Sequence, residues 1–125
     1  MQTVLLVNDS RLEARILMDL LQSLGYTVHL CDEMVALEEM KRILPDVVVV
    51  NYIMKTMRGD ALIGMMKLIR PQMLSVLTSS SEIEADAVRR RRVDAIIRTP
   101  VTREQLRLAI QEASAHHQRG QPMSG

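Results

Sequence analysis

The sequence predicts an α/β fold in which five parallel strands alternate with helices in a doubly wound sheet. Two observations indicate this fold. Five short runs rich in Val, Ile and Leu recur along the 125 residues, and a segment with helical character separates each run from the next. Four of the runs are apolar almost throughout, which is typical of strands covered on both faces. Strands and helices that alternate at this spacing predict right-handed crossovers, with helices on both faces of the sheet.

The predicted strands are short segments, each followed by a polar residue. They cover residues 3–7, 27–31, 46–50, 74–78 and 94–98. The second of them, TVHLC, differs because polar and apolar residues alternate along it. Alternation is typical of a strand with one face toward solvent, so we expect this strand near an edge of the sheet.

Capping residues predict where the helices begin and end. Capping boxes of the Ser/Thr-x-x-Glu/Gln type indicate helix starts at Ser10, Ser81 and Thr102. Gly25 is expected to end the first helix in a left-handed conformation. The second helix is expected over residues 33–43, because Pro45 follows it. Asp60 is the expected N-cap of the third helix.

Apolar residues at helical spacing predict the buried faces of the helices. The predicted stripe of the first helix is Leu12, Ile16, Leu20 and Leu24. That of the third is Leu62, Ile63, Met66 and Ile69, and that of the last is Leu106, Ala109, Ile110 and Ala113. Residues 116–125 show no periodicity. We therefore expect a folded domain over residues 1–117 and a flexible tail, or the start of a linker, over residues 118–125.

Composition limits the function classes only weakly. The chain has 16 basic and 15 acidic residues, so its net charge of +1 indicates no preferred partner. Cys31 is the only cysteine, which excludes an internal disulfide and fits a reducing compartment. No apolar run is long enough to span a membrane, and no signal peptide is recognisable. We expect a cytoplasmic domain that does not contact membranes.

In open α/β sheets the functional crevice lies at the carboxyl ends of the strands. Five polar residues are predicted to lie there, namely Asn8, Asp9, Asn51, Thr78 and Thr99. Asn8 and Asp9 follow the first strand, and Asn51 follows the third. Thr78 ends the fourth strand, and Thr99 follows the fifth.

The loop after the third strand makes this arrangement specific. Its sequence is NYIMKTMRGDAL, in which Asn51 is followed by Met54, Met57, Gly59 and Leu62. With Thr99 and Pro100 after the fifth strand, this spacing resembles the receiver domain of bacterial two-component response regulators, over residues 3 to about 115. The resemblance implies a flavodoxin-like sheet with strand order 2-1-3-4-5. It also implies a family that signals by accepting a phosphoryl group on an aspartate.

Departures from the family pattern change the expected chemistry. Asn51 stands at the phosphoacceptor aspartate, Asn8 at the first acidic position and Thr99 at the lysine. Lys55 replaces the usual proline, and Ile96 replaces an aromatic switch residue. Because the changes at Asn8 and Thr99 accompany that at Asn51, we interpret Asn51 as natural divergence rather than an engineered substitution.

The substituted residues predict a degenerate phosphoacceptor pocket with no catalytic residue. Asn51 offers no anionic nucleophile, and Thr99 lacks the charge of lysine. Mg²⁺ prefers carboxylate ligands, so Asp9 is expected to bind it weakly or not at all, and no cofactor is expected. Two simpler interpretations stay open: Asn51 as the cap of a turn, and Thr78 as an ordinary strand-end residue instead of a switch hydroxyl.

An arginine-rich segment is the second candidate site. Residues 89–107 carry seven arginines and two acidic residues, so seven positive charges minus two negative charges give a local net of +5. In receivers the corresponding face commonly serves dimers and output partners. The predicted partner-binding residues are Arg89, Arg90, Arg91, Arg92, Ile96, Arg98, Arg103 and Arg107. The alternative is a charged helix face that is merely solvated.

The sequence thus predicts a non-catalytic signalling domain, not an enzyme. We expect it to contact a signalling protein or effector domain, or a second copy of itself, without phosphorylation. One alternative is an atypical receiver that is still phosphorylated with the help of Mg²⁺. Another is a basic module associated with nucleic acid, which is disfavoured because no basic recognition helix is evident and aromatic residues are nearly absent.

Overall fold

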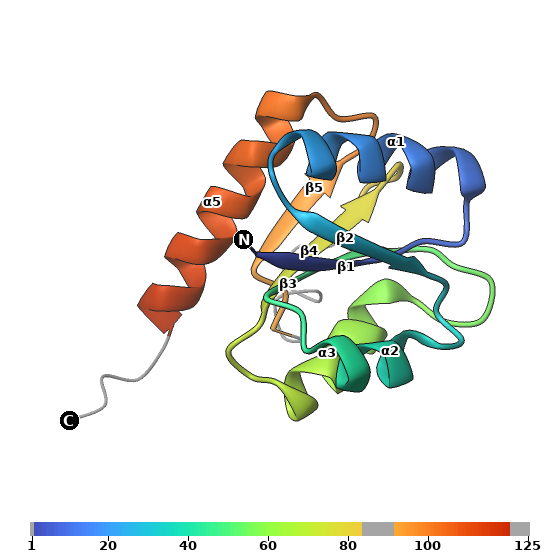
Figure 1. The fold of residues 1–125 in the computed structure, drawn as a ribbon, viewed down its shortest axis with the longest axis vertical. Helices are drawn as coiled ribbons and strands as arrows, with labels where there is room; N and C mark the ends of the chain where they lie inside the picture. The colour runs from blue at the N-terminus through green and yellow to red at the C-terminus, as the bar shows by residue number, and fades with distance from the viewer. Residues whose placement is uncertain (1, 84–91, 121–125) are drawn as a thin grey trace.

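Five parallel strands form a single sheet in the order β2-β1-β3-β4-β5, and helices lie on both faces of it (Figure 1). This computed structural model describes residues 2–83 and 92–120. The strands are β1 (Thr3–Val7), β2 (Thr27–Cys31), β3 (Val47–Asn51), β4 (Leu74–Ser79) and β5 (Ala95–Arg98). The predicted strands and strand order are confirmed, and so is the edge position of β2.

The helices are α1 (Arg11–Ser23), α2 (Ala36–Ile43), α3 (Gly59–Ile69) and α5 (Arg103–Gly120). Figure 1 shows α1 and α5 on one face of the sheet and α2 and α3 on the other. The fourth helix expected from the sequence falls on residues 84–91, which lie outside the described residues. None of the described helices is long and apolar enough to cross a membrane.

One apolar core lies on each side of the sheet, because successive strand residues point to opposite faces. Val4 and Leu6 of β1 pack with α1 and α5, while Leu5 and Val7 pack with α2 and α3. All four side chains are fully buried. Each fully buried side chain of this kind contributes about 1.5–3 kcal/mol. The continuous apolar run of β1 is therefore explained by burial on both sides.

The buried face of α1 differs from the predicted stripe. Ala14, Leu17 and Leu21 are buried, whereas Leu12 is 75% exposed and Ile16 is 49% exposed. A stripe that advances only by four residues drifts around a helix of 3.6 residues per turn, so its first half faces solvent. The predicted stripe is therefore wrong for the first half of α1. Ile69 of α3 was also predicted to be buried and is 39% exposed.

Helix ends follow their caps in part. The Thr102 box is complete, since the Thr102 N–H donates to Gln105 Oε1 at 2.9 Å and the Gln105 N–H donates to Thr102 Oγ1 at 3.1 Å. Gly25 has the predicted positive φ of 98°. The second helix begins at Ala36, later than predicted, because Asp32 forms a turn by accepting the Met34 N–H at 2.8 Å.

The last helix is longer than expected. It continues to Gly120, past residue 117 where we expected the folded domain to end, and residues 121–125 lie outside the described residues. The division into a domain and a tail stays a prediction. The third helix begins at Gly59, and Asp60 lies inside its first turn instead of at the N-cap.

A buried ion pair lies at the opposite end of the sheet from the strand carboxyl ends. Lys67 Nζ donates to Asp94 Oδ2 at 2.9 Å, and their side chains are only 2% and 6% exposed. Asp94 Oδ2 also accepts the Ser75 N–H at 2.9 Å, and Lys67 donates to the Met73 carbonyl. His117 Nδ1 lies 3.7 Å from Asp94 Oδ1. The pair therefore joins α3, the starts of β4 and β5, and α5.

Candidate functional site

The predicted pocket residues lie at the same end of the sheet, where the strands have their carboxyl ends. Asn51 is the last residue of β3, and its register partner in β4 is Thr78. Asn8 and Asp9 follow β1 directly, and Thr99 follows β5. The parallel topology is sufficient to put the loops that carry these residues at the same end.

Asn51 uses its side-chain amide to close the loop that follows it. Its Nδ2 donates to the Ile53 carbonyl at 2.9 Å. An ionised carboxylate at this position could not form this bond, because it has no donor. The asparagine is thus a better cap for this turn than an aspartate is. The bond to Ile53 supports the interpretation of Asn51 as the cap of a turn.

Asp9 is bonded to the same loop. Its Oδ2 accepts the backbone N–H of Lys55 at 2.9 Å. Proline, the residue that receivers usually have at this position, has no N–H and could not donate. The substitution at Lys55 and the use of Asp9 as an acceptor are therefore linked.

A second carboxylate holds the next residue of this loop. Glu33 Oε2 accepts the Thr56 N–H at 3.0 Å, and Glu33 is buried. Burial acts to raise the pKa of Glu33, but the hydrogen bonds from Thr56 and the charge of Lys55 outweigh it, so this pKa is lowered. Sequence reasoning missed Glu33, because its position suggested only the start of the second helix.

Asn8 joins the end of β1 to the first turn of α1. Its Oδ1 accepts the Ser10 N–H at 2.9 Å, and its Nδ2 donates to Glu13 Oε1 at 3.1 Å. Ser10 Oγ accepts the Glu13 N–H at 3.4 Å. In a complete capping box the Ser10 N–H would donate to the Glu13 carboxylate. Here Asn8 bonds to both groups in place of that contact.

The two threonines of the pocket are buried. Thr78 is fully buried, and its Oγ1 lies 3.5 Å from the Val50 carbonyl, a weak hydrogen bond. Thr99 is 9% exposed, and its Oγ1 has no hydrogen-bond partner within the described part of the chain. Burial of Thr78 against Val50 favours its interpretation as an ordinary strand-end residue.

Gly59 allows the loop to close against the end of β3. Its N–H donates to the Tyr52 carbonyl at 2.7 Å. A Cβ atom at this position would lie 2.1 Å from the Asn51 carbonyl oxygen, which is far inside contact distance. The glycine of the loop motif is therefore required by a close approach of two backbone segments and not by a positive φ.

The pocket residues offer few ligands for a metal ion. Asp9 is the only carboxylate among the five predicted pocket residues, and one of its oxygens accepts a backbone N–H. Asn51 is positioned as a donor through Nδ2. In residues 2–83 and 92–120, no three His, Cys, Asp or Glu side chains are grouped so that they could hold a metal ion.

Comparison with known proteins places this chain in a family. The family model of the response regulator receiver domain matches residues 4–111. The chain belongs to the response regulator receiver domain family. A search of curated protein sequences finds no match.

Solved receiver structures share the fold. A CheY-like receiver domain protein from Methanospirillum hungatei has a TM-score of 0.83 at 18% identity, covering 97% of this chain and 99% of that chain. CheY4 of Vibrio cholerae has a TM-score of 0.83 at 19% identity, covering 90% and 98%. NtrX from Brucella abortus has a TM-score of 0.84 at 22% identity, with 94% of this receiver domain matched to 28% of NtrX.

The arginines of the arginine-rich segment of this receiver domain differ in the contacts that they make. Arg103 donates to Oγ and the carbonyl of Ser23, both at 3.1 Å, so it lies against the end of α1. Arg107 forms an ion pair with Glu104. Arg92 and Arg98 are exposed, and Ile96 is 36% exposed. The predicted partner residues Arg89, Arg90 and Arg91 lie outside the described residues.

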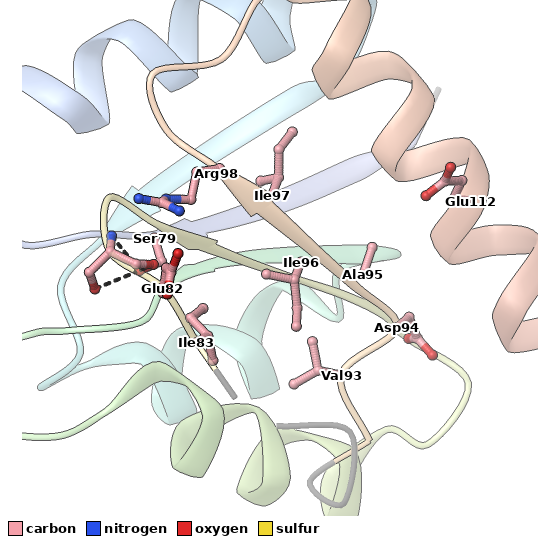
Figure 2. Close-up of a pocket in the computed structure, with 11 residues that line it drawn as sticks. Ser79, Glu82, Ile83, Val93, Asp94, Ala95, Ile96, Ile97, Arg98 and Glu112 are labelled. Carbon is pink, nitrogen blue, oxygen red and sulfur yellow. Dashed lines mark hydrogen bonds between the residues drawn. The ribbon is translucent and has the colours of Figure 1, made fainter. Parts of the chain in front are cut away.

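A hollow of about 460 Å³ lies beside β5. Figure 2 shows Ile83, Val93 and Ile96 lining its apolar part, with Arg98 and Glu82 near one another at one end. Glu112 comes from α5. In the described part of the predicted partner surface, β5 thus presents exposed Ile96 near its centre and exposed Arg98 at its end.

Proposed function

We propose that this receiver domain signals through protein contacts that do not depend on phosphorylation. The observation that carries the proposal is the bonding inside the crevice. Asn51 donates to the Ile53 carbonyl, and Asp9 accepts the Lys55 N–H. Both groups are engaged by the domain's own loop, where a phosphorylated receiver needs a nucleophile and a metal ligand.

The chemistry of phosphoryl transfer supports this proposal. Transfer to a side chain requires an anionic nucleophile, and cations must neutralise the charge of the equatorial oxygens. Asn51 is neutral, and the hydroxyl of Thr99 cannot replace an ammonium group. Mg²⁺ usually takes one or two carboxylates together with waters, and Asp9 alone fits this requirement poorly.

We infer that the partner contacts the β5 side of the domain, and that this occurs in the cytoplasm. Arg98 and Arg92 are exposed there, on either side of Ile96 in the sequence. Exposed arginines favour an acidic partner and speed encounter at low salt. Arg103 and Arg107 contribute less than the sequence indicated, because they bond to Ser23 and Glu104.

Intact mass spectrometry after incubation with acetyl phosphate and Mg²⁺ tests the proposal. The wild-type domain is expected to gain no phosphate. A triple variant that restores the family's groups, Asn8→Asp with Asn51→Asp and Thr99→Lys, serves as the positive control and is expected to gain one. A phosphate on any crevice residue of the wild type would support the alternative of an atypical, phosphorylatable receiver and overturn the proposal.

A further inference from the structure

β2 forms one edge of the sheet, and its outer side pairs with no other strand in the part of the chain that the structure describes. Hydrogen bonds to the neighbouring strand show which residues face outward. The Thr27 N–H donates to the Gln2 carbonyl at 3.1 Å, and the Asn8 N–H donates to the Cys31 carbonyl at 3.1 Å. Because successive residues of a strand direct their backbone groups to opposite sides, Val28 and Leu30 direct their N–H and C=O groups away from the sheet.

The outer side of β2 lacks the features that usually prevent an edge strand from pairing. Such edges are commonly protected by lysine, proline, a bulge or a covering segment. β2 has the sequence TVHLC, with no lysine and no proline, and it pairs with β1 in unbroken register. Leu30 is 44% exposed. The edge therefore combines outward backbone groups with an exposed apolar side chain.

A second copy of the chain matches this edge in one antiparallel register. With a two-fold axis at His29, Val28 of each copy lies opposite Leu30 of the other. These are the outward-facing residues, so each such pair exchanges both of its hydrogen bonds, and His29 takes the non-hydrogen-bonded position between them. Val28 packs on the core beneath α1, and Leu30 shares that face because side chains alternate along a strand. The exposed Leu30 of one copy would thus cover Val28 of the other.

The charges beside β2 favour the antiparallel register. The strand itself contains no Asp, Glu, Lys or Arg, but Asp32 and Glu33 follow it directly. Like charges directly opposite one another oppose strand pairing. In the register centred on His29, the acidic residues of the two copies lie at opposite ends of the paired strands. A parallel pair in register would instead place them side by side.

We propose that two copies of this chain associate through their β2 strands and join their sheets into one. β2 and β5 form opposite edges of the sheet, so this contact goes beyond the partner surface beside β5 and does not depend on it. Two strands of five residues form an interface smaller than the about 1,200–2,000 Å² of stable complexes. The dimer should therefore be weak and depend on concentration, with a Kd on the order of 100 μM.

Engineered disulfides test the register at pH 8. Both variants carry Cys31→Ser, which removes the only native thiol. In a non-hydrogen-bonded antiparallel pair the Cα atoms lie about 4.5 Å apart, which permits a disulfide. His29→Cys should therefore form a linked dimer in a glutathione redox buffer, as measured by intact mass.

Thr27→Cys is the matched control, because it lies on the same face of the same strand. In the proposed register the two residues at position 27 are displaced by four strand positions, about 13 Å, which is too far for a disulfide. Linked dimer should form at least about tenfold more slowly than with His29→Cys. In urea, where β2 is unfolded, the two variants should link at similar rates.

Sedimentation equilibrium tests the backbone contacts. Leu30→Pro removes an outward N–H that the sheet does not use, so the fold should be kept, whereas association should weaken at least about tenfold. Leu30→Ala keeps the N–H and should associate more tightly than Leu30→Pro. Leu30→Lys places a lysine on the edge and should also weaken association at least about tenfold, which covers the case in which the proline variant does not fold. Leu68→Ala, at an exposed leucine of α3, should associate as wild type does.

Three results would overturn the proposal. One is a chain that stays monomeric up to about 1 mM, well above the expected Kd. Another is equal rates of linkage for His29→Cys and Thr27→Cys in native buffer. The third is a dimer that persists unchanged in Leu30→Pro and Leu30→Lys, which would place the contact on another surface.

Discussion

Asp9 Oδ2 accepts the backbone N–H of Lys55 at 2.9 Å, and this bond joins the loop after β1 to the loop after β3. Glu33 makes a parallel contact with the Thr56 N–H at 3.0 Å. Two carboxylates from neighbouring strand ends therefore hold two successive amides. We interpret this pair of bonds as the reason that the crevice keeps the shape of a receiver site without a bound cation.

Replacing Lys55 with proline tests the Asp9 contact. Lys55→Pro removes the N–H donor, and the free energy of unfolding is expected to fall by about 1 kcal/mol, since the bond is charge-assisted but partly exposed. Lys55→Ala is the matched control, because it removes the side chain and keeps the N–H. Urea unfolding at neutral pH measures both. Equal stabilities of the two variants would show that the bond contributes nothing.

Asn51→Asp tests the amide donor. The change removes the bond to Ile53 and places a negative charge near its carbonyl, so the free energy of unfolding should fall by about 1–2 kcal/mol at pH 7. Asn51→Ala loses the donor without adding charge and should be less destabilised. Because the introduced carboxyl is protonated at low pH, the difference between the two variants should shrink near pH 4, close to the ordinary pKa of an aspartate. A difference that is independent of pH would contradict this electrostatic account.

Glu33 predicts a dependence of stability on pH. Its pKa in the folded domain is lowered from 4.5. A lowered folded-state pKa means that Glu33 contributes stability above the unfolded-state value, and that this contribution is lost as pH falls through the folded-state value. Wild type should therefore exceed Glu33→Gln in stability by a constant amount above about pH 5 and lose that advantage below it. Glu38→Gln, at an exposed glutamate of α2, is the control, and a similar pH profile for it would refute the assignment.

The strands and their order could be predicted from the sequence, because long apolar runs leave few alternatives in a parallel sheet. The position of the crevice at the carboxyl ends of the strands could be predicted from the parallel topology alone. The partners of its residues did not, because the bonds of Asn51 and Asp9 depend on the conformation of a loop. Glu33 and Thr56 are separated by 23 residues, and Arg103 and Ser23 by 80, so no local pattern indicates either contact.

The predicted stripe of α1 is wrong in its first half for a physical reason. Leu12 and Ile16 match the pattern of a buried stripe, yet they lie beside Ala14 and Leu17, which occupy the core. Apolar residues at helical spacing show that a helix has an apolar face, but they do not show whether that face lies toward the core or toward solvent. Here both faces are apolar.

The buried pair of Lys67 and Asp94 should be strongly coupled. Lys67→Met leaves the Asp94 carboxylate buried without its ammonium partner, so the free energy of unfolding is expected to fall by about 3–5 kcal/mol. Asp94→Asn should lower the free energy of unfolding much less in the Lys67→Met variant than in the wild type. The expected coupling energy between the two residues is at least about 1 kcal/mol. The exposed pair Arg15 and Asp19 is the control, with an expected coupling below about 0.5 kcal/mol. Additive effects at Lys67 and Asp94 would refute the coupling.

Calorimetric titration of Mg²⁺ tests most directly the claim that the side chains of Asn51 and Asp9 are already hydrogen-bonded to the loop after β3 and are poor metal ligands. The wild type is expected to bind Mg²⁺ with a Kd of about 1 mM or weaker, because Asp9 is the only carboxylate among the five predicted pocket residues and already accepts the Lys55 N–H. The double variant Asn8→Asp with Asn51→Asp should bind at least about tenfold more tightly, since both changes add charge beside Asp9. Equal affinities, or micromolar binding by the wild type, would contradict the account.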